Sequence, residues 1–362
     1  MDKLDLYAKV VLSSGINLRK GQCLRINCGG DNYNFARILG QEAYKMGAKY
    51  VYINILDNHL TLSRLENQEG EDLDYLPHFM INFGQEMLTD DWAVIRIDST
   101  EEIGVLKNAD PEKMSRNRKT ASKKLKFISR SLMSDEHPWC VITVPGPKWA
   151  QTVLGKGATE EDLWEIMKPI LRLDQDDPVK AWDEHNKTIR KRCDDYNNLK
   201  FDRIRFQSEG TDLTVGLSEK SIWCGGSTSL PSGRLFNPNI PSEEIFTTPD
   251  WRRTEGRVKV TKPVKVMEKQ VLGAEFIFEK GKVVNFRADE GGEILKKYLE
   301  TDEGAAYLGE VALVQNDSPI SNSGKIFNSI LIDENASCHI ALGAGYPTCF
   351  KGYEELDTTE KL

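Results

Sequence analysis

The sequence predicts an α/β N-terminal domain with a mostly parallel sheet, followed by an α+β, strand-rich C-terminal domain. In the first half, short apolar runs alternate with helical patterns, whereas after Asn198 short alternating segments are separated by turn residues. The first pattern is typical of βαβ units and the second of antiparallel strands. A chain of 362 residues is also longer than most single domains. We therefore expect two domains, at 1–198 and 199–362.

The elements of the first half follow from the spacing of its apolar residues. Apolar runs predict strands near 24–28, 50–56, 92–98 and 139–147. Helical patterns between and after them predict helices near 33–46, 110–133, 160–171 and 178–196.

The second half alternates apolar and polar residues over short stretches. This pattern predicts strands within 201–207, 211–217, 257–266 and 274–288. Residues 279–282 lie inside the last stretch and predict a hairpin turn, because Gly281 can adopt positive φ at little cost. A helical pattern at 292–299 interrupts the strands.

Composition excludes several classes of protein. No apolar run reaches the length of about 18 residues that a membrane span requires, and the charged N-terminus lacks the apolar core of a signal peptide. Seven scattered cysteines without a CxxC pair are typical of reduced thiols in the cytosol. The net charge of −8 disfavours attraction to nucleic acid. We expect a cytoplasmic protein that binds neither membrane nor nucleic acid.

Three clusters in the second half combine carboxylates or an imidazole with small or proline-rich neighbours: 237–250, 304–310 and 333–339. Two carboxylates and one histidine can hold Zn²⁺ or Co²⁺ and leave a position open for water. Spacing alone does not fix such a site, since no compact string such as HExxH is present.

Each of the three candidate ligands also has a structural interpretation. His339 lies between small and apolar residues, where a histidine is commonly a hydrogen-bonded core residue. Glu244 follows a proline-rich loop and is compatible with an acid at a helix start. Glu310 has apolar neighbours, and because an unpaired carboxylate is costly there, a cation or another partner is favoured.

Three sequence strings resemble those of a known family, and this resemblance favours metal ligands over structural roles for the three residues. The chain resembles the metallo-aminopeptidase family of aminopeptidase T, aminopeptidase S and PepS in NIPSEEIFTTPD (239–250), in EGAAYLGEVALV (303–314) with the SPIS that follows, and in DENASCHIALGAGY (333–346). These strings occur in order within residues 200–350, and the first half has the family's α/β pattern.

The resemblance implies a metal-dependent aminopeptidase that releases N-terminal amino acids from peptides by metal-activated water. It implies Glu244, Glu310 and His339 as metal ligands, with Glu310 bridging two divalent ions (Zn, Co or Mg) in each active site. Tyr346 is implied as a catalytic donor to the oxyanion. Glu243 either holds the geometry of its neighbour or is a solvated residue. The family also implies a homodimer.

The resemblance also implies ligands that this sequence does not contain. The family's HisxAsp pair lies further along the chain than Leu362, the last residue of the sequence. We therefore expect a C-terminally truncated catalytic domain and impaired turnover. The alternative is a catalytically inactive binding or interaction protein on the same fold. A nucleotide-using enzyme is a further alternative, but the phosphate-binding motifs are absent.

Other signals favour structural roles. We expect surface or core positions for the remaining histidines, which are His59, His78, His137 and His185. A cationic run between Arg116 and Arg130 is interpreted as a solvated helix face rather than a nucleic-acid site. Residues 28–31 predict a tight turn with Asp31 as the N-cap of the next helix.

Overall fold

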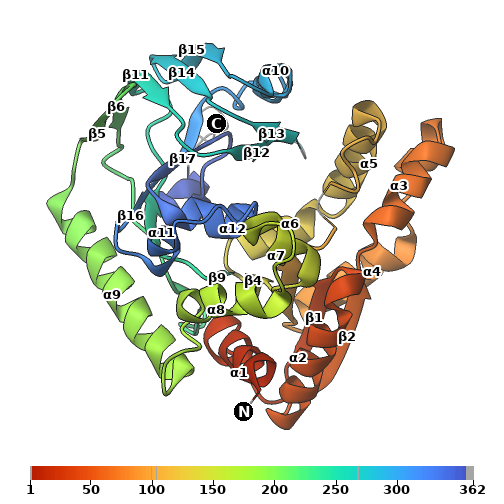
Figure 1. Cartoon of the computed structure of the whole chain (residues 1–362). Coiled ribbons are helices and arrows are strands. Elements are labelled where there is room, and N and C mark those ends of the chain that lie inside the picture. The colour runs from red at the N-terminus through yellow and green to blue at the C-terminus, as the bar shows by residue number, and fades with distance from the viewer. Residues whose placement is uncertain (1, 99, 103, 267–268, 356–362) are drawn as a thin grey trace. The chain divides into compact units, whose positions relative to one another are not determined.

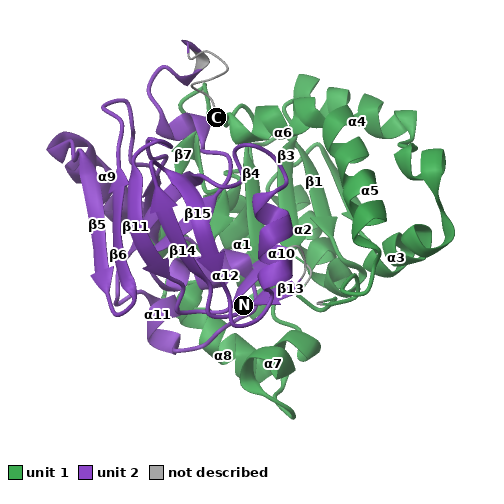
Figure 2. Cartoon of the chain, turned by 90° about the horizontal axis from the view of Figure 1, so that it is seen from above, with its two compact units in different colours: residues 1–185, 227–241 green, residues 186–226, 242–362 purple. Residues whose placement is uncertain are grey.

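The computed structural model describes residues 2–98, 100–102, 104–266 and 269–355 (Figure 1). The chain forms two compact units, which are coloured separately in Figure 2. Unit 1 holds the described residues up to His185 together with Ser227–Pro241. Unit 2 holds Asn186–Gly226 and the described residues from Ser242 onward. None of the described helices is both long and apolar enough to cross a membrane.

Unit 1 is built on a parallel sheet with the strand order β2-β1-β3-β4-β9. Its strands are β1 (Cys23–Cys28), β2 (Tyr50–Ile55), β3 (Ala93–Asp98), β4 (Trp139–Thr143) and β9 (Asn239–Ile240). Its helices are α1 (Lys3–Val10), α2 (Tyr33–Lys45), α3 (Asn58–Asn67), α4 (His78–Thr89), α5 (Pro111–Lys124), α6 (Lys126–Met133), α7 (Pro147–Leu154) and α8 (Glu160–Ile170). Single turns lie at η1 (Val11–Gly15), η2 (Gly30–Asn32) and η3 (Gly70–Asp74), and a short hairpin is formed by β7 (Thr228–Ser229) and β8 (Leu235–Phe236).

Helices cover both faces of this sheet. On one face, α2 packs against β1 and β2, and the ring of Phe35 in α2 stacks on Tyr7 of α1 with centroids 5.2 Å apart. On the other face, a cluster containing Cys23, Met87 and Val94 is completed by side chains of α4 and α6. The α/β fold class predicted for the first half is thereby confirmed.

Two local predictions for this unit are wrong. The single helix expected at 110–133 is two helices, because Leu125 leaves helical geometry (φ −107°, ψ 14°). The break lets α5 contact η3 while α6 contacts α4. Asp31 is not a cap either: Asn32 occupies the N-cap position of α2, and its side chain accepts no capping hydrogen bond.

The long helix α9 (Pro178–Leu199) carries the chain from unit 1 into unit 2, and unit 2 is rich in antiparallel strands. One sheet has the order β15-β14-β11-β6-β5 and a second the order β10-β16-β17. The first contains β5 (Arg203–Ser208), β6 (Thr211–Gly216), β11 (Thr254–Lys259), β14 (Glu275–Glu279) and β15 (Lys282–Arg287). The second contains β10 (Glu244–Thr247), β16 (Leu308–Val314) and β17 (His339–Leu342). A further pair is β12 (Val264–Val266) with β13 (Lys269–Val271), and the remaining elements are α10 (Gly292–Leu299), α11 (Pro319–Ser323), α12 (Ile330–Asp333), η4 (Glu334–Ala336), η5 (Pro347–Cys349) and η6 (Tyr353–Glu355).

One apolar core joins the elements of unit 2. It contains Ile189 of α9, Val215 of β6, Phe278 of β14 and Val311 of β16, all with at most 1% of their surface exposed. The hairpin β14–β15 forms as predicted, with Lys280 and Gly281 both at positive φ. The strand-rich class predicted for the second half is confirmed.

The two units interleave along the chain. Segment 227–241 lies in the second half of the sequence but belongs to unit 1, where β9 pairs in parallel with β4. Nothing in the local alternation of this segment reveals that its partner is a distant strand. The single domain boundary expected at 198 stays a prediction.

Candidate metal centre

Glu244, Glu310 and His339 come from three adjacent strands of unit 2. Glu244 begins β10, Glu310 lies in the central strand β16, and His339 begins β17. The register pairs Glu244 with Val314, and His339 with Ala312. Paired residues share a face, and so do residues two apart in a strand. All three side chains therefore project from one face of this sheet.

A β-bulge beside the site places the donor Glu310 and the neighbouring core residues on opposite faces of β16. The register between β16 and β17 shifts between Leu308 and Glu310, so Gly309 is the extra residue. Leu308 and Val311 can therefore both enter the apolar core while Glu310 projects from the opposite face. An added Cβ at Gly309 would lie 2.3 Å from the carbonyl oxygen of Ala344, so only glycine fits here without movement.

The donor atoms of the three side chains converge. His339 Nε2 lies 3.1 Å from Glu244 Oε2 and 3.8 Å from Glu310 Oε1. One ligand atom from each residue lies within 4.8 Å of the other two. Donors bonded to one ion at about 2.0–2.2 Å are separated by about 3.0–3.5 Å. The observed separations match a common cation after small shifts of the Glu310 side chain.

The imidazole of His339 is oriented by the backbone of its own segment. Its Nδ1 lies 3.0 Å from the carbonyl oxygen of Ser337. A carbonyl only accepts hydrogen bonds, so Nδ1 must carry a proton and donate it. The lone pair of a neutral ring is then on Nε2, the nitrogen that faces the two carboxylates.

Glu244 provides the sharpest indication of a cation. The residue is only 5% exposed, and its Oε2 accepts no hydrogen bond from any residue that the structure describes. A buried carboxylate oxygen without such a partner is costly. The nearest described group that can bear a positive charge is His339, whose Nε2 lies 3.1 Å away and is charged only when the imidazole is protonated.

The surroundings shift the pKa values of two of the donors upward. Burial, and then the charge of Glu244, raise the pKa of Glu310 to about 7, with His339 acting in the opposite direction. Burial lowers the pKa of His339, but the carboxylates of Glu244 and Glu310 outweigh this and raise it to about 10. The metal-free site therefore retains protons that a cation has to displace.

Tyr346 is anchored beside this sheet by two neighbours from the β10 segment. Its ring packs against Phe246 with centroids 5.2 Å apart. Its backbone N–H donates to Thr248 Oγ1 at 2.9 Å, and the same hydroxyl donates to the Tyr346 carbonyl at 3.4 Å. Burial, followed by the charges of Glu310, Glu334 and Glu244, raises the pKa of the phenol far above its usual value. The phenol thus stays protonated and can donate a hydrogen bond.

Glu243 and Asn335 are buried neighbours of the ligand-bearing segments. Glu243 is 6% exposed, so the interpretation of this residue as a solvated neighbour is wrong. Its backbone N–H donates to Asn335 Oδ1 at 2.7 Å. Sequence reasoning missed Asn335 and Thr248, because their contacts join segments about ninety residues apart. The only local signal was the position of Asn335 within the cluster at 333–339.

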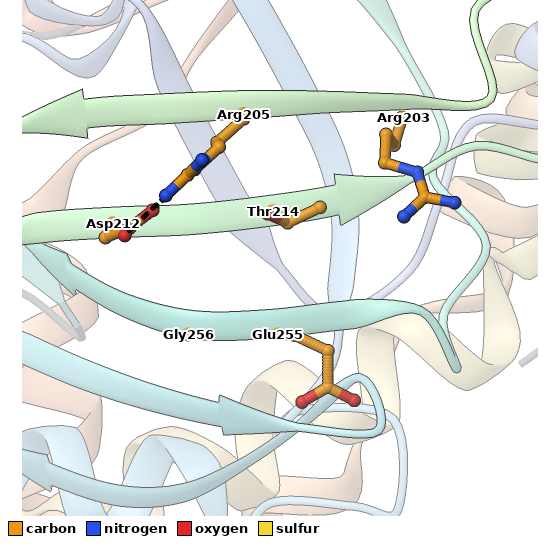
Figure 3. A pocket seen from close by; sticks show the side chains of 6 residues that line it. All are labelled: Arg203, Arg205, Asp212, Thr214, Glu255 and Gly256. Atoms are coloured by element: carbon orange, nitrogen blue, oxygen red, sulfur yellow. Dashed lines mark hydrogen bonds and ion pairs between the residues drawn. The ribbon is translucent and has the colours of Figure 1, made fainter.

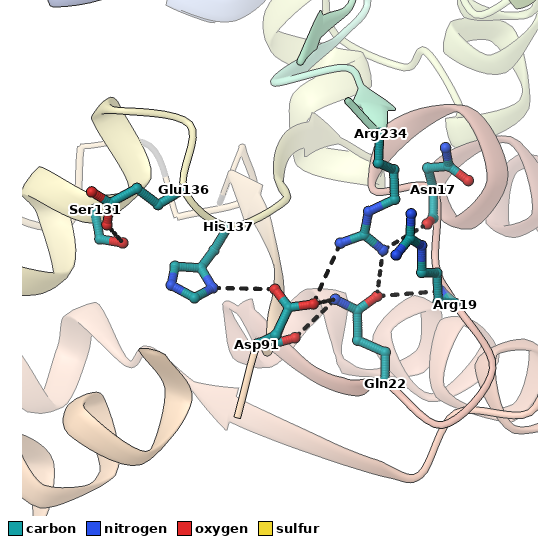
Figure 4. Close-up of polar contacts among 8 residues, drawn as sticks. All are labelled: Asn17, Arg19, Gln22, Asp91, Ser131, Glu136, His137 and Arg234. Atoms are coloured by element: carbon teal, nitrogen blue, oxygen red, sulfur yellow. Dashed lines mark hydrogen bonds and ion pairs between the residues drawn. The ribbon is translucent and has the colours of Figure 1, made fainter. Parts of the chain in front are cut away.

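The other histidines have separate surroundings, as expected. His59 and His78 are exposed, and His185 lies 2.8 Å from an Arg172 nitrogen. Figure 4 shows His137 facing Asp91, with Nδ1 and Oδ1 3.3 Å apart. Among the described residues, Glu244, Glu310 and His339 form the one cluster of at least three potential metal ligands.

The polar network around Asp91 has a structural role in unit 1. Arg234 is 6% exposed and donates to the Asn17 carbonyl at 3.2 Å and to Gln22 Oε1 at 2.9 Å (Figure 4). Gln22 in turn donates to the Asp91 carbonyl at 2.8 Å. These bonds tie segment 227–241 to the segments that precede β1 and β3.

Two charged surfaces carry internal ion pairs. In the cationic run, Arg116 pairs with Asp74, and just before the run Lys113 pairs with Glu69 at 3.0 Å. On the larger sheet of unit 2, a shallow pocket is lined by Arg203, Arg205, Asp212, Thr214, Glu255 and Gly256 (Figure 3). There Arg205 pairs with Asp212 at 2.8 Å, and none of the lining residues belongs to the metal cluster.

The antiparallel unit presents two carboxylates and an imidazole, a donor set that holds a divalent cation in many metal-dependent hydrolases. The chain belongs to the thermophilic metalloprotease (M29) family, whose model matches residues 1–362. This confirms the family resemblance of the sequence strings and the prediction of a metal-dependent peptide hydrolase.

Three relatives illustrate the match. The chain is 37% identical to aminopeptidase 2 of Geobacillus stearothermophilus, over 99% of this chain and 87% of that protein. It is 34% identical to aminopeptidase AmpS of Bacillus subtilis (strain 168), over 99% of this chain and 88% of that protein. The solved structure of wild-type AmpT from Thermus thermophilus aligns with a TM-score of 0.89 and 34% identity, covering 98% of this chain and 88% of that one.

Proposed function

We propose that this metalloprotease is an aminopeptidase that removes N-terminal residues from peptides with a divalent cation held by Glu244, Glu310 and His339. The observation that carries the proposal is the convergence of three donors around Glu244 Oε2, a buried oxygen that accepts no hydrogen bond from the described residues. The relatives are all named aminopeptidases, and these names support cleavage at the N-terminal end of the peptide.

The protein's own residues have distinct roles in this proposal. When bound, a divalent cation polarises the scissile carbonyl and lowers the pKa of the attacking water. Glu244 and Glu310 supply the negative charge that retains the cation, and the Nδ1 bond to Ser337 keeps the His339 lone pair aimed at it. Tyr346 donates a hydrogen bond from its phenol to the oxyanion that forms when the carbonyl is attacked.

Finer features extend the same proposal. The family resemblance supports two ions per active site, with Glu310 as the bridging ligand and zinc, cobalt or magnesium as the metal. It also supports a homodimer, and the scattered cysteines support a cytoplasmic location. Metal analysis of the purified protein and sedimentation equilibrium test the first two features. One ion per chain, or a monomer at micromolar concentration, would refute the corresponding feature.

The activity is tested with paired peptides. Metal-stripped protein is supplied with Zn²⁺, Co²⁺ or Mg²⁺ and given a leucyl peptide with a free or an acetylated N-terminus. We expect metal-dependent cleavage of the free peptide alone. Equal cleavage of the acetylated peptide would contradict exopeptidase action. Metal binding without turnover on either peptide would favour the inactive binding protein.

A further arm of this assay tests Tyr346. Because one lost oxyanion donor costs about 100-fold in kcat, Tyr346→Phe should reduce kcat by about this factor while leaving metal affinity unchanged. Tyr75→Phe is the matched control, since Tyr75 is 63% exposed. A Tyr346→Phe enzyme with the kcat of the control would remove the phenol from the mechanism.

A further inference from the structure

Asn335 connects the backbone that carries Glu244 to the segment that carries His339. Its side chain is completely buried. The amide oxygen accepts the backbone N–H of Glu243 at 2.7 Å, and the amide nitrogen donates to the carbonyl of Leu331 at 3.2 Å. Both ends of the carboxamide are thus used by backbone groups of two different segments.

The bond to Glu243 lies next to the β10–β16 ladder. The pairing of these strands starts at Glu244, and the N–H of the preceding residue, Glu243, donates to Asn335 Oδ1. A buried N–H that loses its acceptor is costly, and the chain around it shifts toward another partner. Because Glu244 is the next residue, such a shift would move its carboxylate relative to the other donors.

The same segment fixes the histidine. Asn335 lies in η4, and two residues later the Ser337 carbonyl holds His339 Nδ1 at 3.0 Å. The Asn335 carbonyl itself accepts the hydroxyl of Ser318 at 3.4 Å, and Ser318 follows the end of β16. Segments adjoining all three ligand-bearing strands therefore meet at one asparagine.

We propose that Asn335 is a positioning residue of the metal centre: it sets the spacing between Glu244 and His339 and thereby the affinity for a divalent cation. This inference rests on the proposed function, since it concerns the same three ligands. The carboxamide carries its acceptor and its donor on two separate atoms, so it can bond the Glu243 N–H and the Leu331 carbonyl at once without a net charge.

The test compares metal affinity with stability. Asn335→Leu removes both hydrogen bonds at similar volume, and Asn335→Ala leaves room for a water should the leucine variant fail to fold. Each variant's Kd for Zn²⁺ is measured by competition with a chelator, and its stability by urea unfolding without metal. We expect the Kd for Zn²⁺ to rise by about 10- to 100-fold, the usual effect of removing a residue that orients metal ligands.

Asn237→Leu is the matched control, because Asn237 is 2% exposed and donates to the Ser14 carbonyl at 2.6 Å in unit 1. It should lose stability without a change in Kd. Asn335→Asp keeps an acceptor for the Glu243 N–H and should retain more affinity than Asn335→Ala.

Two results would overturn the proposals separately. If Asn335→Leu and Asn335→Ala bind Zn²⁺ with the wild-type Kd, Asn335 does not position the ligands. If the wild-type protein binds no Zn²⁺, or binds it as tightly after Glu310→Gln, the proposed metal centre itself is wrong.

Discussion

His339 lies between two carboxylates and one carbonyl oxygen, and this environment controls its proton. The carboxylates favour the charged imidazolium in the metal-free protein, whereas a cation requires the neutral ring. Glu310 behaves in a parallel way, because burial favours its neutral form and a cation requires the carboxylate. Metal binding and proton release are consequently linked at both residues.

The sign of the pH dependence follows from the two raised pKa values. In the metal-free protein, the stability contribution of Glu310 is full below its unfolded value of 4.5 and is lost as pH rises through about 7. The contribution of His339 is full below 6.5 and is lost as pH rises through about 10. Cation affinity should therefore rise with pH over the same range, because fewer protons have to leave.

Proton release can be measured by calorimetry. Titration of Zn²⁺ at pH 7 in buffers of different ionisation enthalpy should show more than about one proton released per ion bound. Glu310→Gln should lower that number, whereas Glu279→Gln, at an exposed position in the same unit, should not change it. Binding without proton release would contradict the protonation states assigned to His339 and Glu310.

At the scale of the element, strand β16 has to serve the core and the metal site at once. The bulge at Gly309 makes this possible, since it lets Leu308 turn inward while Glu310 projects from the other face. The neighbouring strands need no such irregularity, because His339 and Ile340 already alternate between the two faces.

Gly309→Ala should therefore disturb both functions of β16. Its Cβ would meet the Ala344 carbonyl oxygen at 2.3 Å, and overpacking of this kind costs about 1–3 kcal/mol of unfolding free energy. We expect weaker metal binding as well, because Glu310 follows directly. The control is Gly304→Ala, where the contact within 4 Å of an added Cβ is Asp302 Oδ1 at 3.5 Å. Unchanged stability and metal affinity in Gly309→Ala would refute this account of the bulge.

Strings of sequence predicted some features of these elements and not others. Glu244, Glu310, His339 and Tyr346 lie in the three strings that resemble the metallo-aminopeptidase family, and this resemblance rather than their spacing indicated metal chemistry. The break at Leu125 depends instead on what each half of the helix packs against. Likewise, the roles of Asn335 and Thr248 depend on partners that are remote in the chain. Local patterns contain no information on such partners.

At the scale of the whole molecule, the ligands come from one unit. Glu244, Glu310, His339, Tyr346 and Asn335 all belong to unit 2, and its core lies against the opposite face of β16. The match to the family model extends through unit 1 as well, so both units are family features. Because all three ligands lie in unit 2, locating a bound ion there tests the donor geometry directly.

Anomalous diffraction from crystals grown with Zn²⁺ tests the central claim most directly. Data collected on both sides of the zinc absorption edge should give a peak about 2.0–2.2 Å from Glu244 Oε2, a Glu310 oxygen and His339 Nε2. A zinc peak that lies elsewhere, with these three side chains uncoordinated, would contradict the proposed metal centre.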